Sequence, residues 1–211
     1  LKKAKKNCKI IVGQIASPLP PKNILRLYDL IISSISHFVE YLKSIGVKSD
    51  YLKLAFEPQI LKDIPKPEKK YDVSFIGSFT PYHIARTKML ASIAKKIPIN
   101  IWGQGLNVIS SLSPLKQYFH GECWGLEMYK ILAQSKIVIN CHIGVAEDDA
   151  NNMRLYEATG MGALLITDYK SNLNKLFKIG QEAIMYSDSQ DLINKIQYYL
   201  LHDNEREKIA N

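Results

Sequence analysis

Carboxylates, an arginine and two asparagines gather in one short segment of the sequence. Asp149 and Glu157 lie eight positions apart, and Arg154 precedes Glu157 by about one helical turn, so both side chains project to one side of a helix. Asn151 or Asn152 can cap the start of this helix, where backbone amides have no intrahelical partner. A helix start with bare amides, an arginine and flanking carboxylates suits a ligand with phosphates and sugar hydroxyls. The alternative is an ordinary strand–helix connection with an Arg154–Glu157 surface ion pair.

The residues that follow Glu157 predict the elements that position this segment. Gly160 or Gly162 supplies the left-handed residue that ends a helix at little steric cost. Residues 163–167 form a continuous apolar run, which is typical of a parallel strand covered on both faces, and Asp168 stands at its end. Ligands of open α/β sheets bind beyond the carboxyl ends of strands, so we expect a ligand site here.

Other strand ends supply further candidates. Gly77 and Ser78 follow a predicted strand, where glycine lets a phosphate approach the backbone and serine adds a hydroxyl donor, unless this is a plain turn. Arg86 is the nearest fixed cation to this strand end. The alternative, a solvated arginine on a helix, suits the sequence equally well. His142 ends another predicted strand, where a neutral imidazole can donate to a phosphate or sugar or be satisfied by the backbone.

Strand-like and helical patterns alternate almost throughout the sequence, which predicts parallel sheets with helices on both faces. Between residues 57 and 70 the pattern is lost among three prolines and several charges, as in a linker. Strands are predicted at residues 9–14, 28–33, 51–56, 71–76, 97–102, 136–142, 163–167 and 183–186, and helices at 36–45, 84–96, 126–134 and 190–201.

Two domains are expected, at residues 1–62 and 63–211. The first holds only about three strands, too few to cover both faces of a doubly wound sheet. Because the sequence does not begin with methionine, we interpret this part as the second half of a domain that starts upstream.

Composition narrows the classes of protein. The 211 residues are 46% hydrophobic and 23% charged, which is typical of a globular protein, and no apolar run reaches the ~18 residues of a membrane span. Three cysteines without a close pair argue against a disulfide framework or a zinc site and favour a reducing, cytoplasmic compartment. No nucleic-acid-binding signature accompanies the net charge of +8. Much of that charge lies in a solvated basic cluster that also suits peripheral contact with an anionic membrane, made of Lys2, Lys3, Lys5, Lys6 and Lys9.

Several motifs, in order, resemble the group 1 glycosyltransferases. Asp149 and Glu157 stand where that family has its acidic–seven–acidic motif, with Asp in place of the usual first Glu. Residues 150–168 look more closely like the spore-maturation (CgeB-like) branch, as do residues 71–78, 120–129 and 187–211. The resemblance covers residues 71–211 well and the first ~60 residues more loosely.

The resemblance implies a GT-B fold, in which two Rossmann-like domains face each other across a cleft. The amino-terminal domain, partial here, receives the acceptor, and the carboxy-terminal domain, complete here, holds the nucleotide-sugar. The implied activity is transfer of a sugar from a nucleotide-diphosphate-sugar to an unknown glycan, protein or lipid-linked acceptor. The alternatives are a non-catalytic nucleotide-sugar-binding or spore-surface structural module, and a sugar-nucleotide epimerase of the same architecture.

The resemblance also implies roles for particular residues. Asp149 would face the transferred sugar, and Glu157 would accept hydrogen bonds from the ribose hydroxyls. The amides around Asn152 and Met153 would meet the diphosphate, although Asn152 stands where related enzymes often have glycine. Arg154 would add charge there, in competition with its ion pair to Glu157.

Two further regions complete the implied site. Family enzymes place a basic residue from the region of Arg86 against the donor diphosphate. His120 and Gly121 resemble the family's approach to the nucleobase pocket, where Trp124 and Tyr129 would pack on a base unless they belong to the core.

Neither a metal nor a cofactor is expected. Glu147, Asp148 and Asp149 are three successive carboxylates, but the Asp-x-Asp motif of manganese-dependent GT-A enzymes is missing, and such loop carboxylates are usually solvated. No Gly-x-Gly-x-x-Gly stands at a strand–helix junction, which argues against an NAD enzyme.

Overall fold

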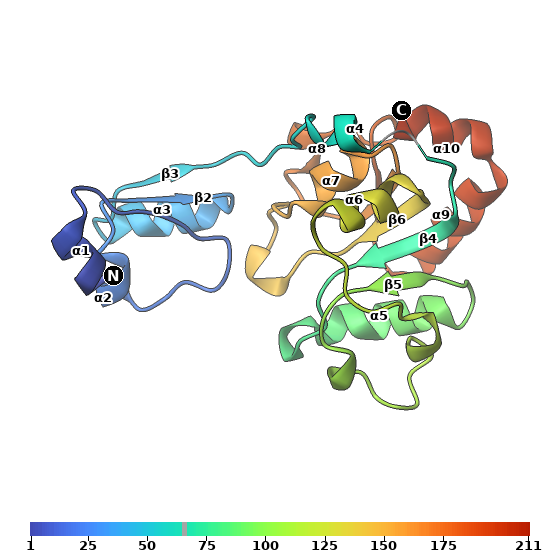
Figure 1. The fold of residues 1–211 in the computed structure, drawn as a ribbon, viewed down its shortest axis with the longest axis horizontal. Coiled ribbons are helices and arrows are strands. Elements are labelled where there is room, and N and C mark those ends of the chain that lie inside the picture. The colour runs from blue at the N-terminus through green and yellow to red at the C-terminus, as the bar shows by residue number, and fades with distance from the viewer. Residues whose placement is uncertain (65–66) are drawn as a thin grey trace.

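The computed structural model describes residues 1–64 and 67–211, which form two parallel sheets with flanking helices (Figure 1). The first sheet has the order β1-β2-β3 and all its strands are parallel. Its strands are β1 (Val12–Gln14), β2 (Leu30–Ser33) and β3 (Ser49–Tyr51), and its helices are α1 (Lys2–Asn7), α2 (Lys22–Leu25) and α3 (Ser36–Ser44).

The second sheet has the order β5-β4-β6-β7-β8 and is also parallel throughout. Its strands are β4 (Tyr71–Ile76), β5 (Asn100–Trp102), β6 (Ser135–Asn140), β7 (Leu164–Asp168) and β8 (Ile184–Tyr186). The helices are α4 (Ile60–Asp63), α5 (Ile84–Ala94), α6 (Gly125–Ala133), α7 (Arg154–Gly160), α8 (Leu173–Leu176), α9 (Ser189–Leu201) and α10 (Asp203–Ala210). The predicted α/β fold of parallel sheets flanked by helices is therefore confirmed.

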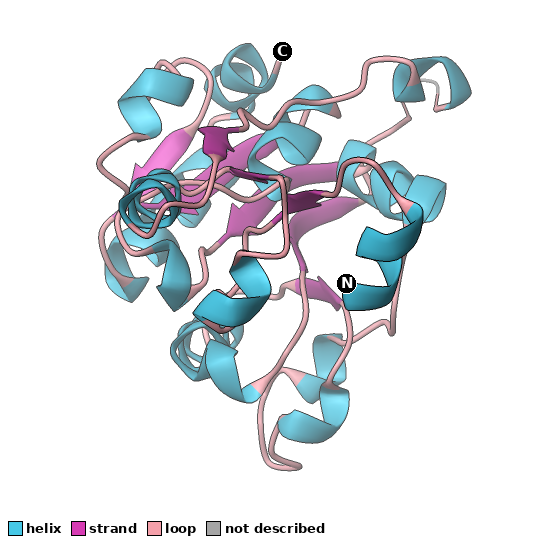
Figure 2. Ribbon diagram, turned by 90° about the vertical axis from the view of Figure 1, so that its left-hand side faces the viewer, coloured by secondary structure: helices cyan, strands magenta, loops and turns pink. Residues whose placement is uncertain are grey.

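Helices cover both faces of the second sheet (Figure 2). Successive residues of a strand point to opposite faces, so Ile137 and Ile139 of β6 enter the core under α5 and α9, whereas Val138 enters the core under α6 and α7. A strand buried on both faces needs a continuous apolar sequence, which explains why these strands were recognisable. No helix in the described parts of the chain is long and apolar enough to cross a bilayer.

The segment after β3 connects the two sheets. It runs from the first sheet to α4 (Figure 1). Phe56, Ile60 and Ile64 pack in the core of the second sheet. Gly160 makes room for this segment, because a Cβ there would lie 2.4 Å from the Phe56 ring. The expected boundary at residues 62/63 stays a prediction, but these side chains pack with the second sheet from residue 56 onward.

The structure corrects two local predictions. The strand predicted at residues 51–56 is wrong, because β3 spans Ser49–Tyr51 and the chain then leaves the sheet. The predicted asparagine cap is also wrong, since α7 begins at Arg154 with Met153 as N-cap and no side-chain cap bond. The glycine stop is confirmed at Gly162, which has a φ of +68°. Pro65, one of the linker prolines, lies outside the described residues, as does Lys66.

The close approach of two strand-end glycines leads to the first prediction. Gly103 has a φ of +147°, and a Cβ there would lie 2.1 Å from the Gly77 carbonyl oxygen. Gly180 also has a positive φ, +85°, but a Cβ there would meet nothing within 4 Å. Gly180→Ala should therefore cost only the left-handed strain of roughly 1–2 kcal/mol, whereas Gly103→Ala should cost about 1–3 kcal/mol more through overpacking.

Thermal unfolding of the two variants beside the wild type measures this difference. At roughly 2–4 °C per kcal/mol for a chain of this size, Gly103→Ala should melt clearly below Gly180→Ala. Equal melting temperatures would show that the two strand ends can separate without loss.

Candidate functional site

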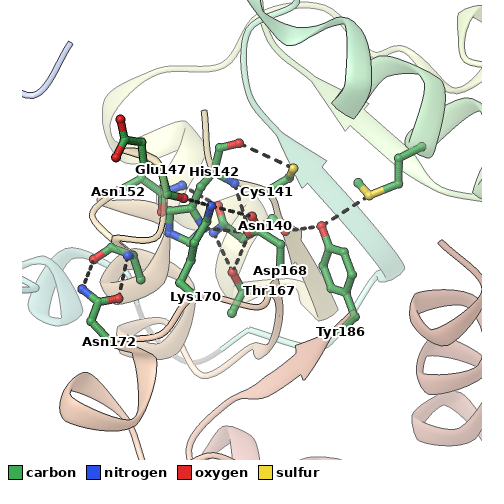
Figure 3. Close-up of polar contacts among 12 residues, drawn as sticks. Asn140, Cys141, His142, Glu147, Asn152, Thr167, Asp168, Lys170, Asn172 and Tyr186 are labelled. Atoms are coloured by element: carbon green, nitrogen blue, oxygen red, sulfur yellow. Dashed lines mark hydrogen bonds and ion pairs between the residues drawn. The ribbon is translucent and has the colours of Figure 1, made fainter. Parts of the chain in front are cut away.

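The carboxyl ends of β4, β6 and β7 meet at one edge of the second sheet. The residues that follow these strands include Ser78 after β4, Cys141 and His142 after β6, and Asp168 at the end of β7. Figure 3 shows the side chains from β6, β7 and β8 converging there. This is the sheet edge at which the sequence predicted a ligand.

A buried asparagine connects the strand ends (Figure 3). The side-chain Nδ2 of Asn140 donates to Thr167 Oγ1 at 2.9 Å, and its side-chain Oδ1 accepts from Asn152 Nδ2 at 2.9 Å. The Tyr186 hydroxyl donates to the Asn140 carbonyl at 3.1 Å. Asn152 thus fixes the segment before α7 to the end of β6, and its own Oδ1 is buried without a hydrogen-bond partner among the described residues.

His142 and Asp168 form the centre of the cluster. Asp168 Oδ1 accepts from His142 Nδ1 at 2.7 Å and from the His142 backbone amide at 3.0 Å. The His142 side chain is fully buried, and Nε2 has no hydrogen-bond partner in the described chain. We infer that Nδ1 carries the proton in the neutral ring, which makes Nε2 an acceptor rather than the donor that the sequence suggested.

The charge on Asp168 is stabilised by its neighbours. Burial alone would raise the pKa of this carboxyl, but the two hydrogen bonds from His142, together with the charge of Lys170, bring the pKa below its usual value. Lys170 Nζ lies 4.0 Å from Asp168 Oδ2 and donates to the Glu147 carbonyl. Lys170 was not predicted, although its position two residues after a strand-end carboxylate was a usable signal.

Arg86 reaches the same edge from α5. It donates to the Ser78 carbonyl, its guanidinium carbon lies 5.2 Å from the centre of the Phe75 ring, and its Nε is buried without a hydrogen-bond partner in the described structure. Burial lowers the pKa of Arg86, whereas the nearby Cys141, Tyr186 and Asp168 raise it. Arg86 is therefore not a solvated helix arginine.

The two cations converge on Cys141. Burial raises the pKa of its thiol, and the charges of both Arg86 and Lys170 oppose that shift. Arg86 donates to the carbonyl of Ser78 and Lys170 lies beside Asp168, so both positive charges stand at the carboxyl edge of the sheet.

Arg154 and Glu157 form an ion pair, but it is not on the surface. Arg154 Nη1 lies 2.9 Å from Glu157 Oε2, and the two side chains are 14% and 11% exposed. Burial lowers the pKa of Arg154 and Glu157 raises it. Two residues of α6 complete the surroundings, since Arg154 Nη2 contacts Met128 Sδ at 3.4 Å and the Tyr129 hydroxyl donates to Glu157 Oε1 at 3.4 Å.

Asp149 contacts the first sheet's helix α3. Its Oδ2 accepts from the backbone amide of Ser36 at 2.8 Å and from the Ser36 hydroxyl at 2.6 Å. His37 Nδ1 lies 3.5 Å from the same oxygen. The carboxylate that was expected to face the transferred sugar is thus held at the start of α3, between the two sheets.

The residues expected near a base lie beside β5 and α6. The His120 ring stacks on Trp102 at 4.6 Å, and its Nε2 lies 2.9 Å from Asn100 Oδ1. Gly121, with a φ of +96°, accepts from the Gly103 amide at 2.8 Å. Trp124 is 60% exposed and is therefore not a core residue.

The structure therefore brings some predicted residues together and separates others. Gly77, Ser78, Arg86, His142 and Asn152 share the sheet edge, and the Arg154–Glu157 pair follows it along α7. No group of three or more metal-ligating side chains occurs among residues 1–64 and 67–211. Independence of a metal ion stays a prediction.

Comparison of the sequence with known protein families gives one match. Residues 86–211 match the sequence model of the glycosyl transferase-like family. No curated protein is significantly similar to the sequence.

Solved structures of low sequence identity share the fold. Anabaena Alr3699/HepE in complex with UDP and glucose aligns with a TM-score of 0.63 and 12% identity over 95% of this chain and 64% of that chain. A mutant of S. aureus TarM in complex with Fondaparinux, alpha-GlcNAc-glycerol and UDP gives 0.66 and 11% over 94% and 45%. The T4 phage beta-glucosyltransferase gives 0.63 and 14% over 95% and 67%.

These identities support a likeness of fold alone, and they confirm the GT-B type that the sequence implied. The chain spans 64% of the Anabaena structure and 45% of TarM.

The bond between His142 and Asp168 leads to a pH-dependent prediction. Asp168→Asn keeps the shape but removes the charged acceptor, so we expect a loss of roughly 1–3 kcal/mol in the free energy of unfolding at neutral pH. Because the folded pKa of Asp168 is lowered, its stabilisation is present above the ordinary value of 3.8 and is lost as the pH falls through the folded value.

Melting temperatures of the wild type and of Asp168→Asn, measured from neutral to acidic pH, test this pH dependence. Their difference should narrow below pH 3.8. Asp72→Asn is the control, since Asp72 is 62% exposed in its ion pair with Lys136 and should change stability by at most ~1 kcal/mol. A constant difference across the pH range would contradict the role of the Asp168 charge.

Proposed function

The chain belongs to the glycosyl transferase-like family, and on this premise we propose that it binds a nucleotide-diphosphate-sugar and transfers the sugar to an acceptor without a metal ion. The observation that carries the proposal is that Arg86, Lys170 and buried His142 all lie at the carboxyl edge of the second sheet, where Nε2 of His142 has no hydrogen-bond partner among the described residues. Fixed cations beside a buried polar atom suit a diphosphate joined to a sugar.

We assign the diphosphate to Arg86 and Lys170. Both are held by backbone carbonyls, of Ser78 and Glu147 respectively, so their charges are positioned before a ligand arrives. Preorganised cations bind a phosphate without first losing side-chain freedom, which favours affinity. The backbone amides of Asn152 and Met153, just before the start of α7, would complete the expected contacts with the diphosphate.

The sugar and the nucleoside would lie on either side of the diphosphate. His142 Nε2 would accept from a sugar hydroxyl, because Nδ1 already donates to Asp168. Glu157 would accept from the ribose hydroxyls, and Arg154 holds its carboxylate in place. His120, Gly121 and the exposed Trp124 would line the position of the base.

In the proposed reaction the bond between the anomeric carbon and the diphosphate oxygen breaks, the oxygen of an acceptor hydroxyl bonds to that carbon and releases its proton, and negative charge grows on the departing nucleotide. Arg86 and Lys170 would stabilise that charge, and loss of one such donor typically raises a barrier by ~2.7–4 kcal/mol. Both bonds from Ser36 end on Asp149 Oδ2, so we assign the expected contact with the transferred sugar to Oδ1.

The finer assignments rest on the sequence. We propose the CgeB-like branch because of residues 150–168, and a reducing cytoplasmic location, which agrees with the three free cysteines Cys8, Cys123 and Cys141. The exposed helix α1 carries four of the five lysines of the basic cluster, and contact of this cluster with an anionic membrane remains a proposal. A non-catalytic binding module and an epimerase are the competing functions, which turnover assays with UDP-sugars would separate.

Binding of UDP is the direct test of the donor site. Calorimetry should detect UDP binding with equal affinity in EDTA and in manganese, because cations of the protein meet the diphosphate. Lys170→Met should weaken UDP binding roughly tenfold to a hundredfold, since a hydrogen bond to a charged group contributes about 1.5–3 kcal/mol.

Lys175→Met provides the matched control, because Lys175 is an exposed lysine five residues away on α8. It should leave UDP binding unchanged. Loss of binding in EDTA that manganese restores would refute the metal-free site, and absence of heat on folded protein would refute the donor site itself.

Glu157→Gln tests the ribose contact. A charged acceptor forms hydrogen bonds roughly twice as strong as a neutral one, so the substitution should weaken UDP binding. It should also lower the melting temperature, because Arg154 would remain buried without its counter-charge.

UDP affinity and melting temperature must therefore be measured together. Uridine has the ribose but no phosphates, so its affinity should fall by the same factor as the affinity for UDP. Lower stability with unchanged affinity for both ligands would mean that the pair is structural and that the ribose lies elsewhere.

A further inference from the structure

A groove lies between the two sheets, outside the residues assigned to the donor. It is formed by the loop of residues 18–21, by Phe38 and Tyr41 of α3, and by Val145 from the loop after β6. Its volume of about 570 Å³ is within the range of small-molecule pockets. We propose that this groove binds the acceptor, and that the acceptor is an uncharged hydroxyl compound with an apolar body. This rests on the proposed transferase function.

The walls of the groove are apolar and rigid. The loop contributes Pro18, Leu19, Pro20 and Pro21, and three prolines limit the conformations open to it. Phe38 is buried, whereas Tyr41 is 45% exposed and lines the groove. A preformed apolar surface favours binding of an apolar body, because little side-chain freedom is lost.

The polar groups are concentrated around His37. Its Nδ1 lies 3.5 Å from Asp149 Oδ2 and its Nε2 lies 4.0 Å from Glu147 Oε1. The ring is 32% exposed and lines the groove, so it can share a hydrogen bond with a ligand hydroxyl. Lys22 and Glu147 also line the groove with opposite charges, which suits a ligand without net charge.

Glu147 connects the groove to the donor site. It has a φ of 48° and a ψ of −112°, a strained conformation for a residue other than glycine. Lys170 donates to the carbonyl of this residue (Figure 3). Strained residues held by their surroundings cluster at functional sites. Its carboxylate points away from the donor cluster (Figure 3), and Glu147 lines the groove.

The geometry therefore places an acceptor beside the donor. Lys170, assigned to the diphosphate, and Glu147, which lines the groove, are in direct contact. A hydroxyl held at His37 would lie at the end of the groove where Asp149 and Glu147 reach from the second sheet. The apolar body would extend along Tyr41 toward the proline loop.

The test compares two glucosides that differ only in their tail, n-octyl β-glucoside below its micelle concentration and methyl β-glucoside. Backbone-amide NMR titration of the 211-residue chain should show at least tenfold tighter binding of the octyl compound, with shifts at Leu19, at Lys22 and at residues 36–41 and 143–147. Tyr41→Glu should abolish this preference. Tyr82→Glu is the control, because Tyr82 is 80% exposed and lies outside the groove.

A second variant tests the hydroxyl contact. His37→Ala should weaken the binding of both glucosides severalfold. The preference for the octyl compound should remain, because the apolar wall of the groove is unchanged. Equal binding of the two glucosides, or an octyl preference that survives Tyr41→Glu in a protein of wild-type melting temperature, would overturn the groove. Unchanged binding in His37→Ala would overturn the assignment of that residue.

A parallel titration with UDP separates this inference from the donor site. UDP binding without octyl glucoside binding would overturn the groove alone. Octyl glucoside binding without UDP binding would overturn its role as an acceptor site, because no donor would stand beside it.

Discussion

A carboxylate at the end of a strand buried on both faces needs partners, and the arrangement of the sheet edge follows from that need. Asp168 accepts two hydrogen bonds from His142 and lies beside Lys170, so its charge remains stable despite burial. The same bonds fix the tautomer of His142 and leave Nε2 without a hydrogen-bond partner in the part of the chain that the structure describes. Lys170 in turn holds the strained Glu147. One buried charge thus orients groups of the donor site and of the groove.

The second constraint is the contact between the sheets. Asp149 is held by the start of α3 through two short hydrogen bonds to Ser36, and unpaired amides at a helix start favour an acidic partner. If Asp149 also contacts the sugar, as we propose, then closing the two sheets and completing the site are the same event. An acidic residue eight positions before Glu157 would therefore serve both the fold and the reaction.

Much of this structure was predictable from the sequence, for definite reasons. The strand at residues 163–167 had to be apolar on both faces, so it was found almost to the residue. The strand at 51–56 was misplaced because Phe56 is apolar for another reason, its packing beside Gly160 in the second core. The contacts of Asp149 with α3 join residues 113 positions apart, and local patterns carry no information about such pairs.

The Arg154–Glu157 pair shows how a correct local prediction can still mislead. Spacing predicted the ion pair, and helix geometry alone placed it on the surface. Packing of α6 over α7 buries it instead, and removing both charges from water costs free energy that their attraction repays only in part. A chain that needed only stability would gain from apolar residues there. Retaining two charged groups under α6 is better explained by a polar ligand that completes their hydrogen bonds, which is what the proposed ribose contact would provide.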